Sequence, residues 1–304
     1  MSTVSRSQST ARSNERPSKR TVPWVVDQKG SDEPLTMVTA YDAPTARILS
    51  DADVDMILVG DSVAMVVLGY DDTLQVTIQD MAHHTAAVAR ARPKSLIVGD
   101  MPWMSYHTSA DDAVRNAAEL IRAGADAIKL EGGAKRLPVV EAILAAEIPV
   151  MGHLGLTPQS IKALGGHKVQ AKEALMVKML VEDAIALADA GCFAIVLECV
   201  PDGVAGLVSE AIHIPTIGIG AGAQTDGQVL VFHDLVGIHD QFKPRFVRRY
   251  AQLGQTATEA VGNFVTDVRG RSYPSAEECY PMNSDTAEVL GLYQESNPRL
   301  SYCP

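Results

Sequence analysis

The chain has 304 residues, of which 46% are hydrophobic, and its 37 acidic and 26 basic side chains give a formal net charge of −11. This acidic balance argues against a nucleic-acid surface, which needs a basic patch, and no apolar run reaches the roughly 18 residues that span a membrane. The four cysteines show no CxxC-type pairing, so the sequence predicts neither a disulfide framework nor a thiolate metal site. The composition predicts a soluble, cytoplasmic enzyme with one large α/β domain.

The two ends of the chain differ in composition from its middle. Residues 1–22 are rich in Ser, Thr and Arg and poor in apolar groups, which predicts a disordered arm. This composition is also typical of a transit peptide, but the segment lacks an apolar face, so the arm is the preferred interpretation. Residues 23–281 are predicted to form the catalytic domain. Residues 282–304 are polar and proline-spaced, which predicts a mobile tail.

Short apolar runs alternate with helical patterns through the middle of the chain. The runs are unbroken, as expected of parallel strands that are buried on both faces. The predicted strands are residues 35–41, 56–60, 95–100, 127–131, 149–154, 193–198 and 216–219, with an eighth strand inside 229–238. The predicted helices are residues 43–49, 78–90, 110–123, 137–146, 172–190 and 251–268. This order predicts a single α/β domain, a (β/α)8 TIM barrel.

One pattern recurs at the ends of the predicted strands, where an apolar run ends in a carboxylate. The carboxylates are Asp61, Asp100, Glu131 and Glu198. A charged group at the end of a buried strand costs free energy unless it is paired or bound to a metal. Because the strands are parallel, all four should lie at the same mouth of the barrel, where barrel enzymes have their active sites.

Three of these carboxylates suggest a metal site. Asp61, Asp100 and Glu131 offer hard oxygen ligands on successive strands, and such ligands suit Mg²⁺ better than zinc. The alternative is that the three are solvated or salt-bridged strand ends. Their common position favours the metal hypothesis.

Polar residues near these carboxylates could bind a substrate. Lys129 shares a strand face with Glu131 and could bind a substrate anion, or it could form an ion pair with a neighbouring acid. His153 could donate a hydrogen bond to the anion or be a satisfied core residue. Ser62, beside Asp61, could donate to the same ligand. Glu198 is flanked by apolar residues and has no evident cationic partner, which suits it to general-base work.

A glycine-rich stretch, residues 218–222, allows two interpretations. It could form a phosphate-binding loop, but it lacks the complete dinucleotide fingerprint and the Lys-Ser/Thr of a P-loop. Tight turning at the end of a barrel strand explains the glycines equally well and is preferred.

These motifs together resemble the 3-methyl-2-oxobutanoate hydroxymethyltransferase family, also called ketopantoate hydroxymethyltransferase. The matching stretches are TAYD (39–42), LVGDS (58–62), GDMP (99–102), IKLEGG (128–133), GHLGLTPQS (152–160), KVQ (168–170), VLECVP (196–201), IPTIGIGAG (214–222) and DGQVLV (226–231). They run in family order from about residue 22 to 281. Two departures are Ala171-Lys172, where the family has a Gly-Arg-like pair, and a tail that extends past the usual end.

The resemblance implies residue roles. Asp61, Asp100 and Glu131 are similar to the family's Mg²⁺ ligands, and Glu198 to its catalytic base. The positions that resemble its ketoacid-binding residues are Asp61, Ser62, Asp100, Lys129 and His153. The resemblance also implies a (β/α)8 barrel that assembles as a homodecamer and opens the pantothenate and coenzyme A pathway.

The implied reaction moves a hydroxymethyl group from 5,10-methylenetetrahydrofolate to 3-methyl-2-oxobutanoate, through an enolate stabilised by Mg²⁺, to give 2-dehydropantoate and tetrahydrofolate. Its expected partners are therefore a small ketoacid and a folate, with neither nucleic acid nor membrane. A rival is a Mg²⁺-dependent carbon–carbon or carbon–phosphorus lyase of the isocitrate lyase and phosphoenolpyruvate mutase type. The absence of a KKCGH-like cysteine motif disfavours it. A non-catalytic scaffold barrel is a further alternative, and it would tolerate the loss of Glu198.

Overall fold

The computed structural model describes residues 18–166, 169–238 and 244–292. Its centre is a closed barrel of eight parallel strands in which each strand pairs with its sequence neighbours and β8 pairs with β1. The strands are β1 (Leu35–Thr39), β2 (Met56–Val59), β3 (Leu96–Asp100), β4 (Ala127–Glu131), β5 (Val150–Gly155), β6 (Ala194–Glu198), β7 (Thr216–Ile219) and β8 (Gly227–Leu230). The predicted (β/α)8 barrel is confirmed.

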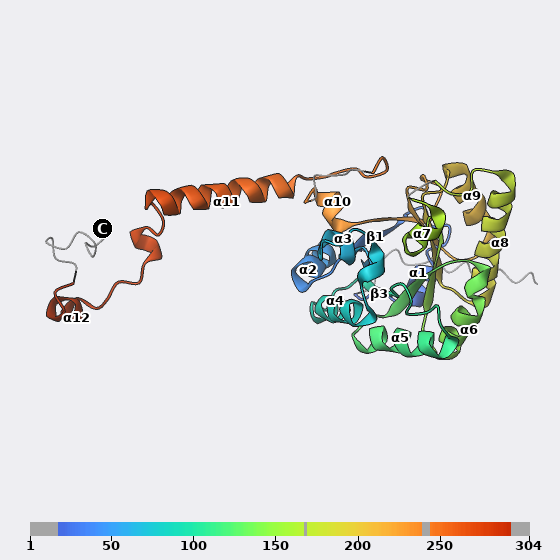
Figure 1. Ribbon diagram of the computed structural model, residues 1–304, viewed down its shortest axis with the longest axis horizontal. Coiled ribbons are helices and arrows are strands. Elements are labelled where there is room, and N and C mark those ends of the chain that lie inside the picture. The colour runs from blue at the N-terminus through green and yellow to red at the C-terminus, as the bar shows by residue number, and fades with distance from the viewer. Residues whose placement is uncertain (1–17, 167–168, 239–243, 293–304) are drawn as a thin grey trace, which may run out of the picture. The chain divides into compact units, whose positions relative to one another are not determined.

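Helices form a ring around the strands (Figure 1). The ring contains α2 (Ala43–Asp51), α4 (Ile78–Arg90), α5 (Ala110–Arg122), α6 (Leu137–Ala145), α8 (Ala174–Ala190) and α9 (Asp202–Ala211). Local sequence fixes several of their starts, since Asp42 and Ser109 cap α2 and α5, and Thr77 forms a capping box with Asp80 at α4. The connections contain α1 (Val22–Val26), α3 (Val63–Val66), η1 (Thr73–Gln75), η2 (Ala134–Arg136), η3 (Pro158–Ser160), α7 (Ile161–Leu164) and α10 (Phe232–Val236).

The eighth strand differs from its prediction. It was expected inside residues 229–238, but β8 begins at Gly227, and α10 replaces the second half of the predicted segment. The Phe232 N–H donates a hydrogen bond to Thr39 Oγ1 (3.0 Å), and the Phe232 ring is buried. Because this backbone donor is taken by a side chain, it is not available to a strand ladder.

Alternate residues of the strands fill the interior of the barrel. Side chains on a strand point to opposite faces in turn, so residues two apart share a face. The inward-facing apolar residues include Leu35 and Met37 on β1, Met56 and Leu58 on β2, Leu96 and Val98 on β3, Ala127 on β4, Met151 on β5, Ala194 and Val196 on β6, Ile217 on β7 and Val229 on β8. This register also decides which polar residues face the mouth.

Three aspartates tie the strands together at the N-terminal end of the barrel. Asp55, Asp126 and Asp226 each precede an even-numbered strand, and each accepts a hydrogen bond from a backbone N–H of the preceding strand. Each also pairs with a cation near the start of the chain. The pairs are Arg20 Nε with Asp55 Oδ1 (3.6 Å), Lys19 Nζ with Asp126 Oδ2 (2.8 Å) and Lys29 Nζ with Asp226 Oδ2 (2.8 Å).

These contacts change the expectation for residues 1–22. Most of the predicted arm, residues 1–17, lies outside the described residues. Arg20, however, is 1% exposed and also contacts Asp53 Oδ1 at 2.7 Å, and Thr21 caps α1. The last residues of the predicted arm therefore belong to the barrel.

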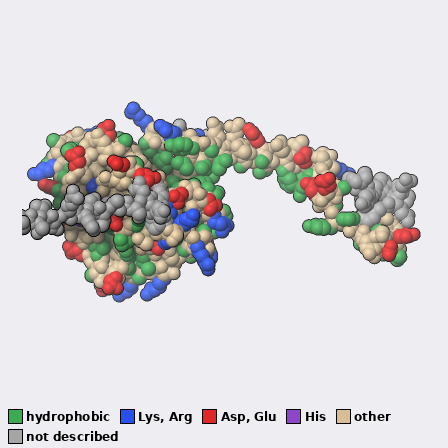
Figure 2. Space-filling view, turned by 180° about the vertical axis from the view of Figure 1, so that it is seen from behind, with side chains coloured by type: hydrophobic (Ala, Val, Ile, Leu, Met, Phe, Trp, Pro, Cys, Tyr) green, Lys and Arg blue, Asp and Glu red, His purple; other side chains and the backbone are tan. Residues whose placement is uncertain are grey.

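Among the described residues, 236–238 and 249–292 fall in a second compact unit. It contains α11 (Leu253–Gly270), η4 (Ala276–Glu278) and α12 (Ser284–Val289). The helix predicted at 251–268 is confirmed as α11, which has no buried residue and shows hydrophobic side chains on its surface (Figure 2). The predicted tail lies partly outside the described residues, which end at 292.

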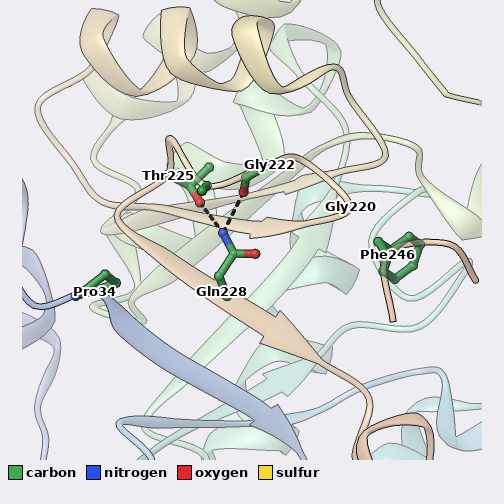
Figure 3. A pocket seen from close by; sticks show the side chains of 7 residues that line it. Pro34, Gly220, Gly222, Thr225, Gln228 and Phe246 are labelled. Carbon is green, nitrogen blue, oxygen red and sulfur yellow. Dashed lines mark hydrogen bonds between the residues drawn. The ribbon is translucent and has the colours of Figure 1, made fainter. Parts of the chain in front are cut away.

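The connection between β7 and β8 contains no helix, and a hollow of about 400 Å³ lies beside it. Gly220 and Gly222 have positive φ angles of 62° and 76°, and a Cβ at Gly222 would collide with Asp202. In Figure 3 the amide nitrogen of Gln228 points toward Gly222 and Thr225, and it donates hydrogen bonds to Gly222 O (2.8 Å) and Thr225 Oγ1 (2.9 Å). Steric need thus accounts for the glycines, as the preferred interpretation held. Within the described residues, no helix is long and apolar enough to cross a membrane.

Candidate active site

The predicted site residues of β3 to β6 continue the inward-facing rows of the barrel. On β3, Asp100 follows Val98 by two positions, and on β4, Lys129 and Glu131 continue from Ala127 at the same spacing. His153 follows Met151 on β5, and Glu198 follows Val196 on β6, in the same way. Register places Asp100 beside Lys129 and Glu131 beside His153. The shared face that the sequence predicted for Lys129 and Glu131 is therefore present.

A row of charged groups crosses the mouth from β3 to β6. Lys129 Nζ lies 2.9 Å from Asp100 Oδ1 and 3.2 Å from His153 Nδ1. His153 Nδ1 lies 3.6 Å from Glu131 Oε1, and His153 Nε2 lies 3.3 Å from Glu198 Oε2. Of the two interpretations of Lys129, the structure shows the ion pair, while its contact with a substrate stays a prediction.

Glu198 has a partner that the sequence did not reveal. It was expected to lack a cationic neighbour, but His153 lies next to it. Burial and Lys129 both lower the pKa of His153, yet Glu131 and Glu198 outweigh them and raise it to about 9. Glu198 is 17% exposed whereas His153 is 4% exposed, so Glu198 is the more accessible end of the row.

Asp61 and Ser62 follow β2, which is the neighbour of β3, the strand that carries Asp100. The Asp61 N–H donates a hydrogen bond to Asp100 Oδ2 (3.1 Å), and Asp61 itself is buried. Ser62 is half-buried, and its Oγ lies 2.8 Å from the Tyr41 hydroxyl. The structure thus brings all seven predicted site residues to one end of the barrel.

Burial and like charge perturb the carboxylates. Burial, followed by the charge of Glu131, raises the pKa of Asp61 to about 6 although Lys129 lowers it. Burial also raises the pKa of Asp100 to about 6, with Lys129 lowering it and Asp61 raising it. A cation that binds beside such buried carboxylates stabilises their charged form.

The donor set fits a hard cation, although the side chains do not enclose one as they stand. Among the described residues, no three His, Cys, Asp or Glu side chains form a ready metal cluster. The Glu131 Oε1 atom is nevertheless buried and accepts no hydrogen bond from any described residue. A buried carboxylate oxygen without a donor is costly, and an oxygen-rich set of this kind suits Mg²⁺.

Sequence reasoning missed two residues at this mouth. Gln159, in η3, donates a hydrogen bond from its side chain to Asp61 Oδ2 (3.0 Å) and from its backbone to Glu131 Oε2 (3.1 Å). The Tyr106 hydroxyl donates to Gln159 Oε1 (2.6 Å). Gln159 lies in GHLGLTPQS, so the motif was found without a role for this residue.

Comparison with known proteins identifies the chain's relatives. A family model described as Ketopantoate hydroxymethyltransferase matches residues 19–276. The 3-methyl-2-oxobutanoate hydroxymethyltransferase of Syntrophobacter fumaroxidans is 52% identical over 271 residues, which are 89% of this chain and 96% of that protein.

Two solved structures share the fold at low sequence identity. One is 2,3-dimethylmalate lyase, a PEP mutase/isocitrate lyase superfamily member, with a TM-score of 0.55 and 16% identity, covering 92% of this chain and 97% of that one. The other is phosphonopyruvate hydrolase in complex with oxalate and Mg²⁺, with a TM-score of 0.55 and 14% identity, covering 89% and 95%. At these identities the likeness concerns the barrel alone.

Proposed function

The chain belongs to the ketopantoate hydroxymethyltransferase family, and from this premise we propose that it transfers a hydroxymethyl group from 5,10-methylenetetrahydrofolate to 3-methyl-2-oxobutanoate. The products are 2-dehydropantoate and tetrahydrofolate. The observation that carries the proposal is the row in which Lys129 and His153 lie between Asp100 and Glu198. It places the His153 imidazole beside a carboxylate that is accessible enough to act as a base, with Lys129 next to that imidazole.

Glu198 is the proposed catalytic base. It takes the proton from C3 of the ketoacid, and the electron pair of that C–H bond moves into the enolate. His153, whose Nε2 lies 3.3 Å from Glu198 Oε2, orients the carboxylate before the transfer. Lys129 and His153 then hold the negative oxygens of the substrate, which is electrostatic stabilisation by groups that are already in position.

The enolate carbon attacks the methylene carbon of the folate, so that a carbon–carbon bond forms. As that bond forms, the carbon's bond to one of the two folate nitrogens that it bridges breaks, and this nitrogen takes up the proton that Glu198 removed. Water then replaces the second folate nitrogen, so that its oxygen becomes the hydroxyl of the product, its proton passes to that nitrogen, and tetrahydrofolate is released. No side chain becomes covalently attached in this sequence. The chain's own residues bind, orient and move one proton.

Asp61, Asp100 and Glu131 are the proposed ligands of Mg²⁺. When bound, the ion would supply Lewis-acid chemistry by drawing negative charge toward the substrate oxygens. Three observations support this assignment: the buried Glu131 Oε1, which accepts no hydrogen bond from a described residue, the raised pKa values of Asp61 and Asp100, and the oxygen-only donor set. The Mg²⁺ in the phosphonopyruvate hydrolase complex is a property of that protein and agrees with the choice of ion.

The lyase alternative shares the barrel and an enolate but not the folate. Its support is the fold of 2,3-dimethylmalate lyase, which at 16% identity carries no residue roles. Proton NMR of 3-methyl-2-oxobutanoate in D₂O separates the two. We expect Mg²⁺-dependent loss of the C3 proton signal, followed by 2-dehydropantoate when the folate is added, whereas exchange without product would favour the lyase.

A matched pair of variants tests the base. Glu198→Gln should retain ketoacid and Mg²⁺ binding and lose C3 exchange. Glu182→Gln, on the exposed surface of α8, is the control and should exchange at the normal rate. Exchange at the wild-type rate in Glu198→Gln would refute the assignment.

We also propose that the chain is a homo-oligomer, which the resemblance implies to be a decamer. Val261, Phe264 and Val268 lie on α11 at a spacing that forms one stripe, and they are 62%, 53% and 44% exposed. An apolar stripe of this kind is typical of a surface that is covered in an assembly. Analytical ultracentrifugation of Phe264→Glu should show a smaller species than the wild type.

A further inference from the structure

Gln159 occupies a central place among the carboxylates. It is 4% exposed and contacts two of the three proposed metal ligands at once. Its backbone N–H donates to Glu131 Oε2 (3.1 Å), and its side-chain Nε2 donates to Asp61 Oδ2 (3.0 Å) and Met101 O (2.9 Å). One residue thus spans two carboxylates that repel each other, one just after β2 and one at the end of β4.

The orientation of the Gln159 amide is fixed by its partners. Met101 O and the Asp61 carboxylate accept hydrogen bonds, so they must face the amide nitrogen. Tyr106 completes the arrangement, because its hydroxyl donates to Gln159 Oε1 (2.6 Å) and accepts from the Glu131 N–H (3.2 Å). Tyr106 is fully buried, and burial raises its pKa well above the usual range, so it keeps the proton that it donates.

The hydrogen bonds leave the carboxylates available for a cation. Gln159 engages Glu131 Oε2, whereas Glu131 Oε1 accepts no hydrogen bond from the described residues. On Asp61, the amide contacts Oδ2. Each carboxylate is therefore anchored through one oxygen, which is how groups behind a metal site orient its ligands.

We propose that Gln159, supported by Tyr106, is a positioning residue that holds Asp61 and Glu131 in place for a divalent cation. This inference rests on the proposed function in assigning a metal to these carboxylates. It assigns to η3 a role in metal affinity rather than in proton transfer. Gln159 touches neither Lys129 nor Glu198 in any hydrogen bond of the structure's described residues.

Direct titration with Mg²⁺ tests the inference without using turnover. Isothermal titration calorimetry of Gln159→Met should give a dissociation constant about 10- to 100-fold weaker than the wild type, the usual effect of removing a group that orients a metal ligand. Gln228→Met is the matched control, since this glutamine also makes two side-chain hydrogen bonds but lies at the β7–β8 hollow. Its affinity for Mg²⁺ should be unchanged.

Tyr106→Phe supplies a second, milder variant. It keeps the ring but removes the hydroxyl, and we expect Mg²⁺ affinity to fall by about three- to tenfold, the usual effect of one hydrogen bond. Because the Tyr106 hydroxyl supports the Gln159 amide, the two effects should overlap, so the double variant should lose less Mg²⁺ affinity than the product of the two single losses. With either single variant, saturating Mg²⁺ should restore kcat, which a purely structural role would not predict.

Several outcomes would overturn the inference. One is a folded Gln159→Met with Mg²⁺ affinity within about twofold of the wild type, below the effect of one hydrogen bond. If Gln159→Met does not fold, an unchanged affinity of Tyr106→Phe for Mg²⁺ would overturn the inference in its place. Failure of the wild type to bind Mg²⁺ removes the site altogether. Wild-type binding with the expected variant effects, but without formation of 2-dehydropantoate, would instead refute the proposed reaction and leave the positioning role intact.

Discussion

Lys129→Met removes the charge of a buried side chain while keeping its length. Lys129 is 3% exposed, and its Nζ lies 2.9 Å from Asp100 Oδ1. At that separation and an effective dielectric constant of about 20, the attraction is about 6 kcal/mol. Asp100 can relieve part of the loss by taking up a proton, because burial raises its pKa to about 6 even beside Lys129. We expect the free energy of unfolding to fall by about 3–5 kcal/mol.

Urea unfolding without divalent cations measures this loss, and its pH dependence checks the cause. A raised carboxyl pKa means that the folded state binds the extra proton, so stability falls as pH rises through the folded-state pKa. Without Lys129 that pKa lies still higher, so the deficit should be larger near pH 8 than near pH 5.5.

Lys178→Met is the control for this experiment. Its ammonium is 72% exposed and lies 3.7 Å from Glu182 Oε1, so its loss should cost less than about 1 kcal/mol. A deficit for Lys129→Met that is no larger than this control at either pH would refute the reasoning.

Three further predictions concern the frame of the barrel. Gly155→Ala places a Cβ against Glu198 O at a residue with φ of +91°. We expect this strain to lower the free energy of unfolding by about 1–3 kcal/mol, measured by thermal unfolding. Turnover measurements should show a fall in kcat that is larger than the change in KM. Arg20→Met should lower the free energy of unfolding by about 3 kcal/mol, the lower end of the range for breaking a buried ion pair. Urea unfolding measures this loss. For Asp226, burial raises the pKa, but hydrogen bonds, led by the one from Lys29, lower it overall. Asp226→Asn should therefore lose stability near pH 7, with the deficit closing below about pH 4, and a deficit that persists at low pH would contradict this cause.

The strands and the inward-facing site residues were predictable because their pattern is local. An unbroken apolar run such as 127–131 indicates a buried parallel strand, and alternation then places Lys129 and Glu131 on one face. The contact between His153 and Glu198 was missed because it depends on the register of β5 against β6, which no single strand encodes.

Residues outside the strands were harder to predict for the same reason. Gln159 and Tyr106 belong to connections, where position is set by contacts between distant segments rather than by periodicity. Gly203 and Gly206 weaken the helical pattern of α9, which was not predicted. Arg20 looked like part of a polar arm, because the carboxylates that it pairs with, Asp53 and Asp55, lie more than 30 residues away in the sequence.

The pairing of β1 with β8 has a consequence for synthesis of the chain. Leu35 pairs with Gly227, so the barrel closes only after nearly all of its strands have been translated. At about 5–20 residues per second, β1 waits roughly 10–40 s for its partner, and during that time its edge is open to pairing with other chains. A nascent or truncated chain that stops before Gly227 should therefore aggregate, and its solubility should depend on chaperones that cover the open edge.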